Sequence, residues 1–167
     1  MKILVLSDSH SGLSFMRRAI KVVKLNAGIL LGDYYDYGQA MADENRHIPF
    51  HQVPGNCDRY RNYEIRPEML CYNVCGVKLY MTHGHNHRVK MDTYGLLMDA
   101  RNAGAQAVLY GHTHEAVCNL ENDGLWVLNP GACGSSGGSV GLIEVDQGKI
   151  IACRILRLAD LEELWKE

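Results

Sequence analysis

The sequence has no long apolar run and no excess of one charge, and each absence excludes a class of protein. No apolar segment approaches the roughly 20 residues that a membrane-spanning helix needs. Met1 and Lys2 lead directly into an apolar strand pattern rather than a signal peptide. We therefore expect a cytoplasmic protein with no membrane partner. The 17 basic and 19 acidic residues give a formal net charge of −2, so no global field would recruit a polyanion such as DNA.

The cysteines also lack a recognisable pattern. The six cysteines include no C-x-x-C pair and lie mostly within apolar runs, which is typical of reduced thiols rather than a disulfide framework. The chain has no internal repeat and no linker, and the segment 131–141 is its only low-complexity patch. With 167 residues, of which 47% are hydrophobic, we expect residues 1–167 to form a single globular domain.

The order of strand and helix patterns predicts an α/β fold. The segment 2–8 is a continuous apolar run that ends in polar residues, which is typical of a strand buried on both faces. Ser14 is the expected N-cap of a helix whose apolar residues have helical spacing, namely Met16, Ala19, Ile20 and Val23. Residues 27–33 repeat the strand pattern, so the chain begins with a right-handed βαβ unit.

The remaining patterns add strands and three helical segments. We expect a loop with a short helix over 34–46, a short strand within 48–56, and a helix over 92–102 that is capped by Asp92 and stopped at Gly104. Further strands are expected at 69–74, 77–82, 107–110, 116–120, 125–128, 140–145 and 149–156, and a short helix from Ala159. Parallel pairing dominates the first half and antiparallel pairing the second. The predicted fold is two mixed β-sheets packed face to face and flanked by helices.

Polar side chains with metal-binding chemistry follow several of the expected strands. Five of the eight histidines fall in two tight clusters, at 83–87 and 112–114. The candidate ligands at strand ends are Asp8, His10, Asp33, Asn56, His83, His112 and His114. Each alone is more often a cap or a surface residue. Because the carboxyl ends of parallel strands form one edge where binding sites arise, we expect these loops to converge.

The residue types indicate which ions such a site would take. Carboxylate and amide oxygens mixed with imidazoles suit borderline ions such as Mn²⁺, Fe²⁺ or Zn²⁺, whereas an all-oxygen set would suit Ca²⁺. Seven ligands are too many for one catalytic ion, and they suffice for two if one carboxylate bridges them. A pair of ions about 3.5–4 Å apart can clamp a phosphoryl group and stabilise an in-line displacement. Such a pair would supply the local positive field that the net charge does not.

The ordered motifs resemble those of a known family, the calcineurin-like metallophosphoesterases, and in particular the small YfcE-type phosphodiesterases. The motifs are Asp8-Ser9-His10, Gly32-Asp33, Gly55-Asn56, His83-Gly84-His85 and Gly111-His112-Thr113-His114. The resemblance implies that one ion is held by Asp8, His10, Asp33 and His114, and a second by Asp33, Asn56, His83 and His112. It also implies a four-layer sandwich and in-line attack of a metal-bridging hydroxide on phosphorus. Among Mn, Fe, Ni and Zn, we favour Mn for the two divalent ions.

One departure from the family bears on the substrate. Most of the family has a histidine general acid after the Gly-Asn pair, where this chain has Cys57, followed by Asp58 as its expected orienting partner. A positioned general acid contributes about 10²–10⁴-fold, mainly for poor leaving groups. We therefore expect diesters with acidic leaving groups to be preferred over alkyl monoesters. Two interpretations of Cys57 stay open, a proton donor and a small residue near the site. His85 is an alternative proton donor or phosphate contact, and His87 is expected to be a surface residue.

The hypothesis with the most support is a metal-dependent phosphodiesterase for small or activated diesters. A phosphomonoesterase and a binding scaffold like the family's retromer subunit are the alternatives. No stripe of Lys and Arg accompanies the site, so a sequence-specific nucleic-acid partner is not expected. Tyr34, Tyr35 and Tyr37 follow the bridging carboxylate, where they would stack a base or, more ordinarily, form an amphipathic rim. The oligomeric state is expected to be a monomer or a homodimer.

Overall fold

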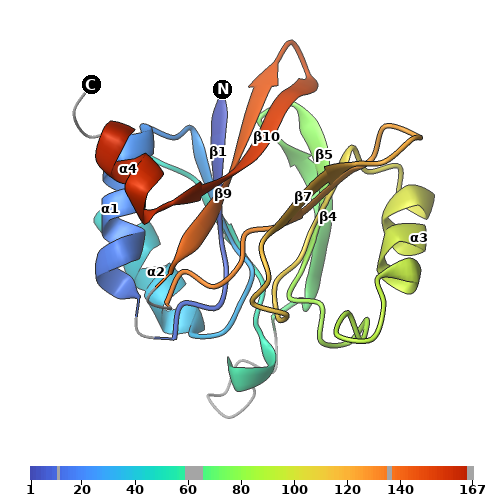
Figure 1. Cartoon of the computed structure of the whole chain (residues 1–167), viewed down its shortest axis with the longest axis horizontal. Coiled ribbons are helices and arrows are strands. Elements are labelled where there is room, and N and C mark those ends of the chain that lie inside the picture. The colour runs from blue at the N-terminus through green and yellow to red at the C-terminus, as the bar shows by residue number, and fades with distance from the viewer. Residues whose placement is uncertain (11, 59–65, 135–136, 165–167) are drawn as a thin grey trace.

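The computed structural model of the chain describes residues 1–10, 12–58, 66–134 and 137–164. Two five-stranded sheets pack face to face, with helices on the outer side of each (Figure 1). The first sheet has the order β10-β9-β1-β2-β3, with β1 (Lys2–Leu6), β2 (Ala27–Leu30), β3 (Phe50–Gln52), β9 (Ser139–Asp146) and β10 (Lys149–Arg157). The second has the order β4-β5-β6-β8-β7, with β4 (Met69–Val74), β5 (Val77–Thr82), β6 (Ala107–Leu109), β7 (Val117–Leu120) and β8 (Trp126–Asn129).

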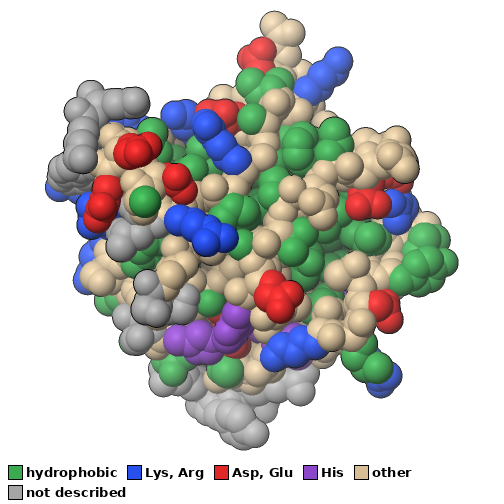
Figure 2. All heavy atoms as spheres, in the orientation of Figure 1, with side chains coloured by type: hydrophobic (Ala, Val, Ile, Leu, Met, Phe, Trp, Pro, Cys, Tyr) green, Lys and Arg blue, Asp and Glu red, His purple; other side chains and the backbone are tan. Residues whose placement is uncertain are grey.

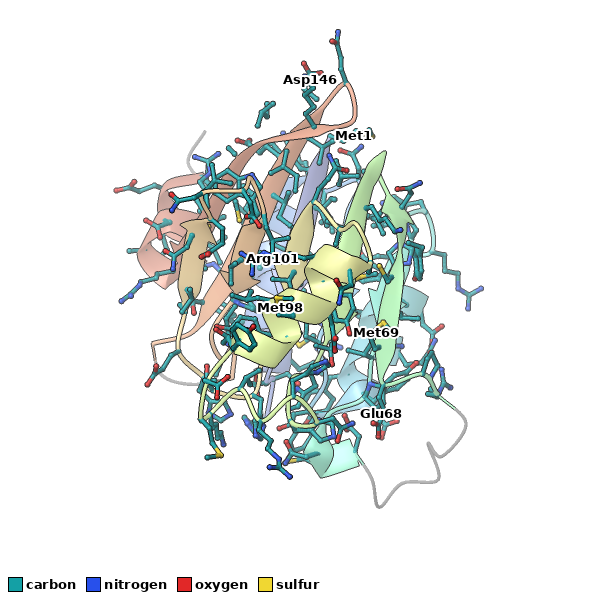
Figure 3. The ribbon with its side chains drawn as sticks, turned by 90° about the vertical axis from the view of Figure 1, so that its right-hand side faces the viewer. Met1, Glu68, Met69, Met98, Arg101 and Asp146 are labelled. Carbon is teal, nitrogen blue, oxygen red and sulfur yellow. The ribbon has the colours of Figure 1, made fainter. Side chains whose placement is uncertain are left out.

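The helices complete a four-layer arrangement. The helices α1 (Leu13–Val23), α2 (Tyr35–Glu44) and α4 (Leu158–Leu164) lie beside the first sheet, and α3 (Tyr94–Asn102) covers the second (Figure 1). Figure 3 looks onto α3, where the Arg101 guanidinium donates to the carboxylate of Asp123 at 2.6 Å and so ties the helix to the β7–β8 turn. The prediction of two mixed sheets flanked by helices is confirmed.

Both sheets have parallel strands at the centre and antiparallel strands toward an edge. In the first, β1, β2 and β3 are parallel, and β9 and β10 extend it with antiparallel pairs. In the second, β5, β6 and β8 are parallel, and β4 and β7 form antiparallel edges. The expected split into a parallel first half and an antiparallel second half was wrong for β8, which pairs parallel with β6 as well as antiparallel with β7. Each sheet instead draws strands from both halves of the chain.

Alternation along β1 explains why its sequence is apolar throughout. Ile3 and Val5 belong to the core between the two sheets, whereas Leu4 and Leu6 belong to the core beneath α1 and α2. A strand buried on both faces places successive side chains in two different cores. This burial fixes β1 at the centre of its sheet, and its carboxyl end therefore opens onto the middle of the sheet edge.

Two helix ends and one helix length differ from the predictions. The N-cap of α1 is Gly12 rather than Ser14, and the backbone of Cys133 and Gly134 lies so close to Gly12 that a Cβ would approach within 2.4 Å of the Cys133 carbonyl oxygen. The N-cap of α3 is Thr93, and the Asp92 carboxylate accepts the Tyr94 amide at 2.9 Å.

The helix α2 has ten residues where a loop with a short helix was expected. Its buried side, with Tyr35, Gly38 and Met41, packs on the first sheet although the segment is mostly polar. A Cβ at Gly38 would lie 2.3 Å from the Gln52 side-chain oxygen, so glycine permits close approach of the helix to β3. Packing therefore overrides weak local periodicity in this segment. Among the described residues, no helix is both long and apolar enough to cross a membrane.

Candidate metal centre

The predicted ligands lie in loops that follow strands at one end of the sandwich. Asp8 and His10 follow β1, Asp33 follows β2, and Asn56 follows β3 within a short 3-10 turn, Asn56–Asp58. In the second sheet His83 follows β5, and the 112–114 loop follows β6. Figure 2 shows histidine side chains gathered at this end of the molecule. The convergence expected from the sequence is therefore present in the fold.

Five of the seven predicted ligands have left-handed backbone conformations. The φ angles are 53° at Asp8, 37° at His10, 55° at Asp33, 67° at His112 and 62° at His114. Such angles are uncommon outside glycine and persist only where the surroundings hold them. Here the amide of Asp8 donates to the Gly32 carbonyl at 3.1 Å, and the amide of His112 donates to the Asp8 carboxylate at 3.0 Å. The loops are thus braced against one another around the candidate ligands.

Two glycines of the motifs permit this close approach. A Cβ at Gly55 would lie 2.1 Å from the Oδ1 atom of Asp33. A Cβ at Gly111 would lie 1.9 Å from the Ser7 hydroxyl and 2.8 Å from Oδ2 of Asp8. Real Cβ atoms do not approach other atoms so closely, so any larger residue would push the loops away from the carboxylates. Steric crowding therefore explains why glycine precedes Asn56 and His112 in the two motifs.

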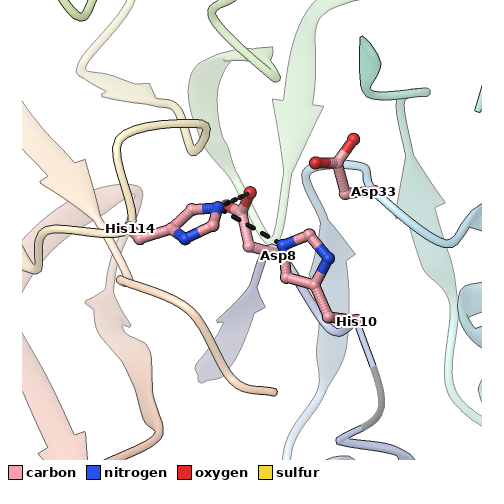
Figure 4. Close-up of side chains that lie close together, drawn as sticks. All are labelled: Asp8, His10, Asp33 and His114. Carbon is pink, nitrogen blue, oxygen red and sulfur yellow. Dashed lines mark hydrogen bonds and ion pairs between the residues drawn. The ribbon is translucent and has the colours of Figure 1, made fainter. Parts of the chain in front are cut away.

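Four of the candidate ligands form one compact group. The ligand atoms of Asp8, His10, Asp33 and His114 all lie within 4.8 Å of one another (Figure 4). The Nε2 atoms of His10 and His114 are 3.3 Å apart, and Nε2 of His114 is 3.0 Å from Oδ1 of Asp8. These are the residues that the family resemblance assigned to a first ion. We call them the first group.

The hydrogen bonds of Asp8 indicate whether the first group could bind a cation. Asp8 is fully buried, and its Oδ2 atom accepts hydrogen bonds from the Ser7 hydroxyl at 2.6 Å and the His112 amide at 3.0 Å. Its Oδ1 atom is buried and accepts no hydrogen bond from the described residues, although the imidazole of His114 lies beside it. A buried carboxylate oxygen without a donor is costly. A divalent cation would satisfy this oxygen together with the two neighbouring imidazoles, so the residues fit a metal ion.

The other candidates gather around His83, which is fully buried. Its Nδ1 atom is 2.6 Å from the Leu31 carbonyl oxygen, so Nδ1–H donates to that oxygen. Its Nε2 atom then faces two oxygen atoms, Oδ1 of Asn56 at 3.1 Å and Oδ1 of Asp33 at 3.6 Å. A carbonyl that fixes the tautomer in this way is a common feature around metal-binding histidines. We call Asp33, Asn56, His83 and His112 the second group.

The imidazole of His112 is neutral at pH 7 and its ring centroid lies 5.1 Å from that of His83. Burial, with the nearby charges of His83 and Lys90, lowers the pKa of His112 to about 4. A neutral imidazole has the lone pair that metal binding requires. His112 therefore contributes to the second group an imidazole that is ready to bind a metal ion.

Asp33 belongs to both groups and is ionised at neutral pH. Burial by itself would raise the pKa of Asp33, but the charge of His83 and the amide of Cys57, which donates to Oδ1 at 2.9 Å, lower it below its usual value. The carboxylate is only 3% exposed. A buried, charged oxygen pair between two sets of imidazoles has the placement that a bridging ligand requires.

Asp58 contacts the backbone of two loops. Its Oδ1 atom accepts the amides of Tyr34 and Tyr35, each at 2.9 Å, and its Oδ2 atom accepts the amide of Gly55 at 2.8 Å. The side chain is buried, so these bonds are shielded from water. Asp58 thus joins the loop that carries Asp33 to the loop that carries Asn56. This contact set differs from the predicted pairing with Cys57.

Cys57 is exposed beside the second group, and its thiol is protonated at neutral pH. Desolvation, followed by a hydrogen bond to Asp33 and the charges of Asp58 and Asp8, raises the pKa of Cys57 to about 11. The Asn56 side-chain amide donates to its sulfur at 3.6 Å. The thiolate form that makes cysteine a nucleophile is therefore scarce at this position.

The two further histidines of the 83–87 cluster have different surroundings. The ring of His85 lies 5.4 Å from that of His83 and 6.1 Å from that of His112, so His85 borders the second group. His87 instead packs against Tyr80, and its Nε2 atom lies 3.2 Å from the Asp99 carboxylate on α3. His87 was expected to be a plain surface residue. Its contacts attach the loop to α3.

Two residues that support the site were not among the predicted ones. Ser7 donates to the Asp8 carboxylate, as described above. Asn129, at the end of β8, is fully buried, and its side-chain amide donates to the Gly111 carbonyl at 3.1 Å and the Thr113 hydroxyl at 2.9 Å. Asn129 therefore holds the loop that carries His112 and His114. The available sequence signal was an asparagine at the end of a buried strand, before Pro130-Gly131.

Comparison with known proteins gives matches over most of the chain. Residues 1–148 match the model of the calcineurin-like phosphoesterase superfamily domain. Phosphodiesterase MJ0936 of Methanocaldococcus jannaschii is 31% identical over 147 residues, which covers 80% of this chain and 84% of that protein. The probable metallophosphoesterase YsnB of Bacillus subtilis is 27% identical over 137 residues, which covers 79% of this chain and 75% of that protein.

The solved structures that share this fold include a predicted phosphoesterase and Vps29 proteins. A Streptococcus pneumoniae protein described as a predicted phosphoesterase has a TM-score of 0.69 at 23% identity, covering 93% of this chain and 97% of that chain. Wild-type Vps29 of Entamoeba histolytica, solved in complex with Zn²⁺, has a TM-score of 0.69 at 19% identity, covering 94% of this chain and 99% of that chain. At these identities the likeness shows a shared fold alone.

Proposed function

Because the chain belongs to the calcineurin-like phosphoesterase superfamily, we propose that it is a metal-dependent phosphodiesterase that hydrolyses small or activated phosphodiesters. The observation that carries the proposal is the buried Oδ1 atom of Asp8, which accepts no hydrogen bond within the described part of the chain and belongs to a group of ligand atoms within 4.8 Å of one another. The first group would hold one divalent ion and the second group another, with Asp33 shared between them. Mn²⁺ is the favoured ion, and Fe²⁺, Ni²⁺ and Zn²⁺ are the alternatives.

The roles of the chain's own residues follow from their contacts. When bound, two divalent ions would supply Lewis-acid stabilisation of the phosphate oxygens and an activated water. The ionised Asp33 and the neutral His112 would bind without first releasing protons at pH 7. Asp58 and Asn129 would keep the loops of both groups at a fixed separation. His85, at the border of the second group, would contact the phosphate or donate a proton.

The preference for diesters rests on Cys57. A thiol stands where a histidine general acid would be expected, and in the metal-free chain its pKa is raised to about 11, whereas an effective general acid has a pKa close to the working pH. Esters with acidic leaving groups need little help from an acid, whereas alkyl monoesters need it most. The proposed substrate is therefore a diester with a stable leaving anion.

The direct test compares two esters of the same leaving group. We expect purified protein loaded with Mn²⁺ to hydrolyse bis(4-nitrophenyl) phosphate with a kcat/KM at least about 10-fold above that for 4-nitrophenyl phosphate, and a chelator should abolish both activities. Release of 4-nitrophenolate reports each rate. Hydrolysis that survives complete metal removal would contradict metal dependence, and a faster monoester would favour a phosphomonoesterase.

The Cys57→His variant tests the role of the missing acid. We expect it to raise hydrolysis of phenyl phosphate at least about 10-fold, because a positioned imidazole contributes about 10²–10⁴-fold with poorer leaving groups. Phosphate release measures the rate. The Cys57→Ser variant isolates the effect of removing the sulfur. A rate with histidine no higher than that with serine would count against the argument.

A binding scaffold is the second candidate, since Vps29 proteins share the fold. Metal content alone does not separate the two functions, because the Entamoeba protein was itself solved with Zn²⁺. Hydrolysis does separate them, and the presence of all seven candidate ligands supports the enzyme. We take residues 1–167 as one domain that acts as a monomer or a homodimer. We also propose that the protein works in the cytoplasm, because its six free cysteines are typical of a reducing compartment.

A further inference from the structure

Two tyrosine rings extend the first group on the side of the α2 helix. The ring of Tyr34 meets the ring of His10 edge to face, with centroids 5.6 Å apart and planes at 76°. The ring of Tyr37 lies beside Tyr34, with centroids 5.3 Å apart and planes tilted by 32°. His10 is one of the four residues of the first group. A continuous aromatic surface therefore leads from the candidate metal ligands to α2. We call Tyr34 and Tyr37 the tyrosine pair.

The backbone of Tyr34 is held in a conformation that bulky residues rarely adopt. Its φ angle is 73°, in the left-handed region. Such a conformation is unfavourable for a tyrosine and persists where neighbouring contacts impose it. Here the Tyr34 amide donates to Asp58 at 2.9 Å, and the Tyr34 carbonyl accepts the Tyr37 amide at 2.9 Å. The ring is thus directed by a braced backbone, as expected of a functional position.

The two rings differ in what they pack against. Tyr37 is partly buried against the core beneath α1 and α2. Tyr34 is half-buried and belongs to none of the three hydrophobic cores found among the described residues. Packing therefore explains the position of Tyr37 but not that of Tyr34. Tyr37 therefore supports the ring of Tyr34, and the ring of Tyr34 lies beside His10.

We propose that Tyr34, supported by Tyr37, is a stacking subsite for a planar aromatic group carried by the phosphodiester, either a nucleobase or an aryl ring. The inference rests on the proposed function and narrows its substrate class. In the reaction, water oxygen forms a bond to phosphorus, and the bond from phosphorus to the leaving oxygen breaks. The leaving group departs with the electron pair, and the proton of water passes to solvent. The ring that stacks on Tyr34 stays on the product monoester.

Three substrates with one leaving group isolate the effect of the ring. On the ester group that stays attached to phosphorus, thymidine 5′-(4-nitrophenyl phosphate) carries a nucleobase, bis(4-nitrophenyl) phosphate carries an aryl ring, and methyl 4-nitrophenyl phosphate carries no ring. Tyr34→Asn is the test variant because asparagine tolerates the left-handed conformation. Tyr34→Phe keeps the stacking face. Tyr94→Asn is the matched control, since Tyr94 lies on α3 and is 72% exposed.

We expect Tyr34→Asn to lower kcat/KM for the ring-bearing esters at least about 10-fold more than for the methyl ester, because the variant removes the face on which the ring stacks. Tyr34→Phe should keep the wild-type ratio, and so should Tyr94→Asn. Damage to the neighbouring Asp33 would lower all three rates together, so only the ratio reports stacking. If Tyr34→Asn lowers the relative kcat/KM of the thymidine ester alone, the subsite binds a nucleobase. If it lowers that of the bis-aryl ester alone, the subsite binds an aryl ring.

A binding measurement separates this inference from the proposed function. Calorimetry should show that wild-type protein binds thymidine 5′-phosphate or 4-nitrophenyl phosphate at least about 10-fold more tightly than methyl phosphate, and that Tyr34→Asn removes the difference. This result would hold even if none of the diesters were hydrolysed, in which case the proposed function alone would fail. Equal ratios and equal affinities in wild type and Tyr34→Asn would overturn the stacking subsite. Circular dichroism verifies that each variant folds.

Discussion

Replacing Asp33 with asparagine is expected to lower kcat/KM for bis(4-nitrophenyl) phosphate by at least about 10³-fold while the protein stays folded, a loss equivalent to about 4 kcal/mol of transition-state stabilisation. Asp33 is the one carboxylate that lies in both groups, within the first group and 3.6 Å from His83. Asparagine preserves the size of the side chain and an oxygen for the Cys57 amide. It removes the negative charge that two cations would share.

The matched control for this variant is Asp43→Asn. Asp43 is an exposed residue of α2, and its carboxylate accepts a hydrogen bond from the Gln39 side chain at 3.3 Å. The same chemical change at this position should leave the rate within about twofold of wild type. Initial rates and metal content are measured for both variants. Activity of Asp33→Asn equal to that of Asp43→Asn would show that the shared carboxylate is not needed.

The Asp58→Ala variant is expected to reduce the free energy of unfolding by about 3 kcal/mol or more. The substitution removes the acceptor of three amides at Tyr34, Tyr35 and Gly55, and an unsatisfied buried donor costs about 1–3 kcal/mol. The buried position gives water little access to replace the lost bonds. Metal affinity should fall as well, because the loops of Asp33 and Asn56 lose their common anchor.

Urea unfolding of two further variants makes the stability argument specific. Asp58→Asn keeps one acceptor oxygen and should have intermediate stability. Asp160→Ala removes an exposed carboxylate that accepts the Arg157 amide at 2.6 Å, and should cost about 1 kcal/mol as other helix caps do. If Asp58→Ala is no less stable than Asp160→Ala, the three amide bonds do not brace the site.

The sequence was sufficient to predict that the candidate ligands converge, because their positions follow directly from where the buried strands end. Strands buried on both faces are recognisable as apolar runs, and the polar residues directly after them must lie at the sheet edge. Asp8, Asp33 and His83 were found in this way. Family motifs added the assignment of ligands to two ions, and that assignment stays a prediction.

What the sequence could not predict depends on contacts between distant backbone groups. Asp58 was expected to orient its neighbour Cys57, yet its acceptor atoms meet amides at Tyr34 and Tyr35, 24 and 23 residues away. The pattern of side chains in a sequence does not show which distant backbone amides a carboxylate will contact. The close packing of Gly12 is a similar case, because the backbone that excludes a side chain there comes from Cys133 and Gly134, more than 100 residues away. The pairing of β6 with β8 is also non-local, since β7 intervenes in sequence.

The most direct test of the central claim is the rate of bis(4-nitrophenyl) phosphate hydrolysis as a function of Mn²⁺ bound per chain, starting from metal-free protein. Two ions that share Asp33 predict a rate that stays low with the first ion and rises to its maximum as the second binds. In Asp33→Asn, the second binding step should be lost together with activity. Full activity with one ion or none per chain would contradict a catalytic centre built from both groups.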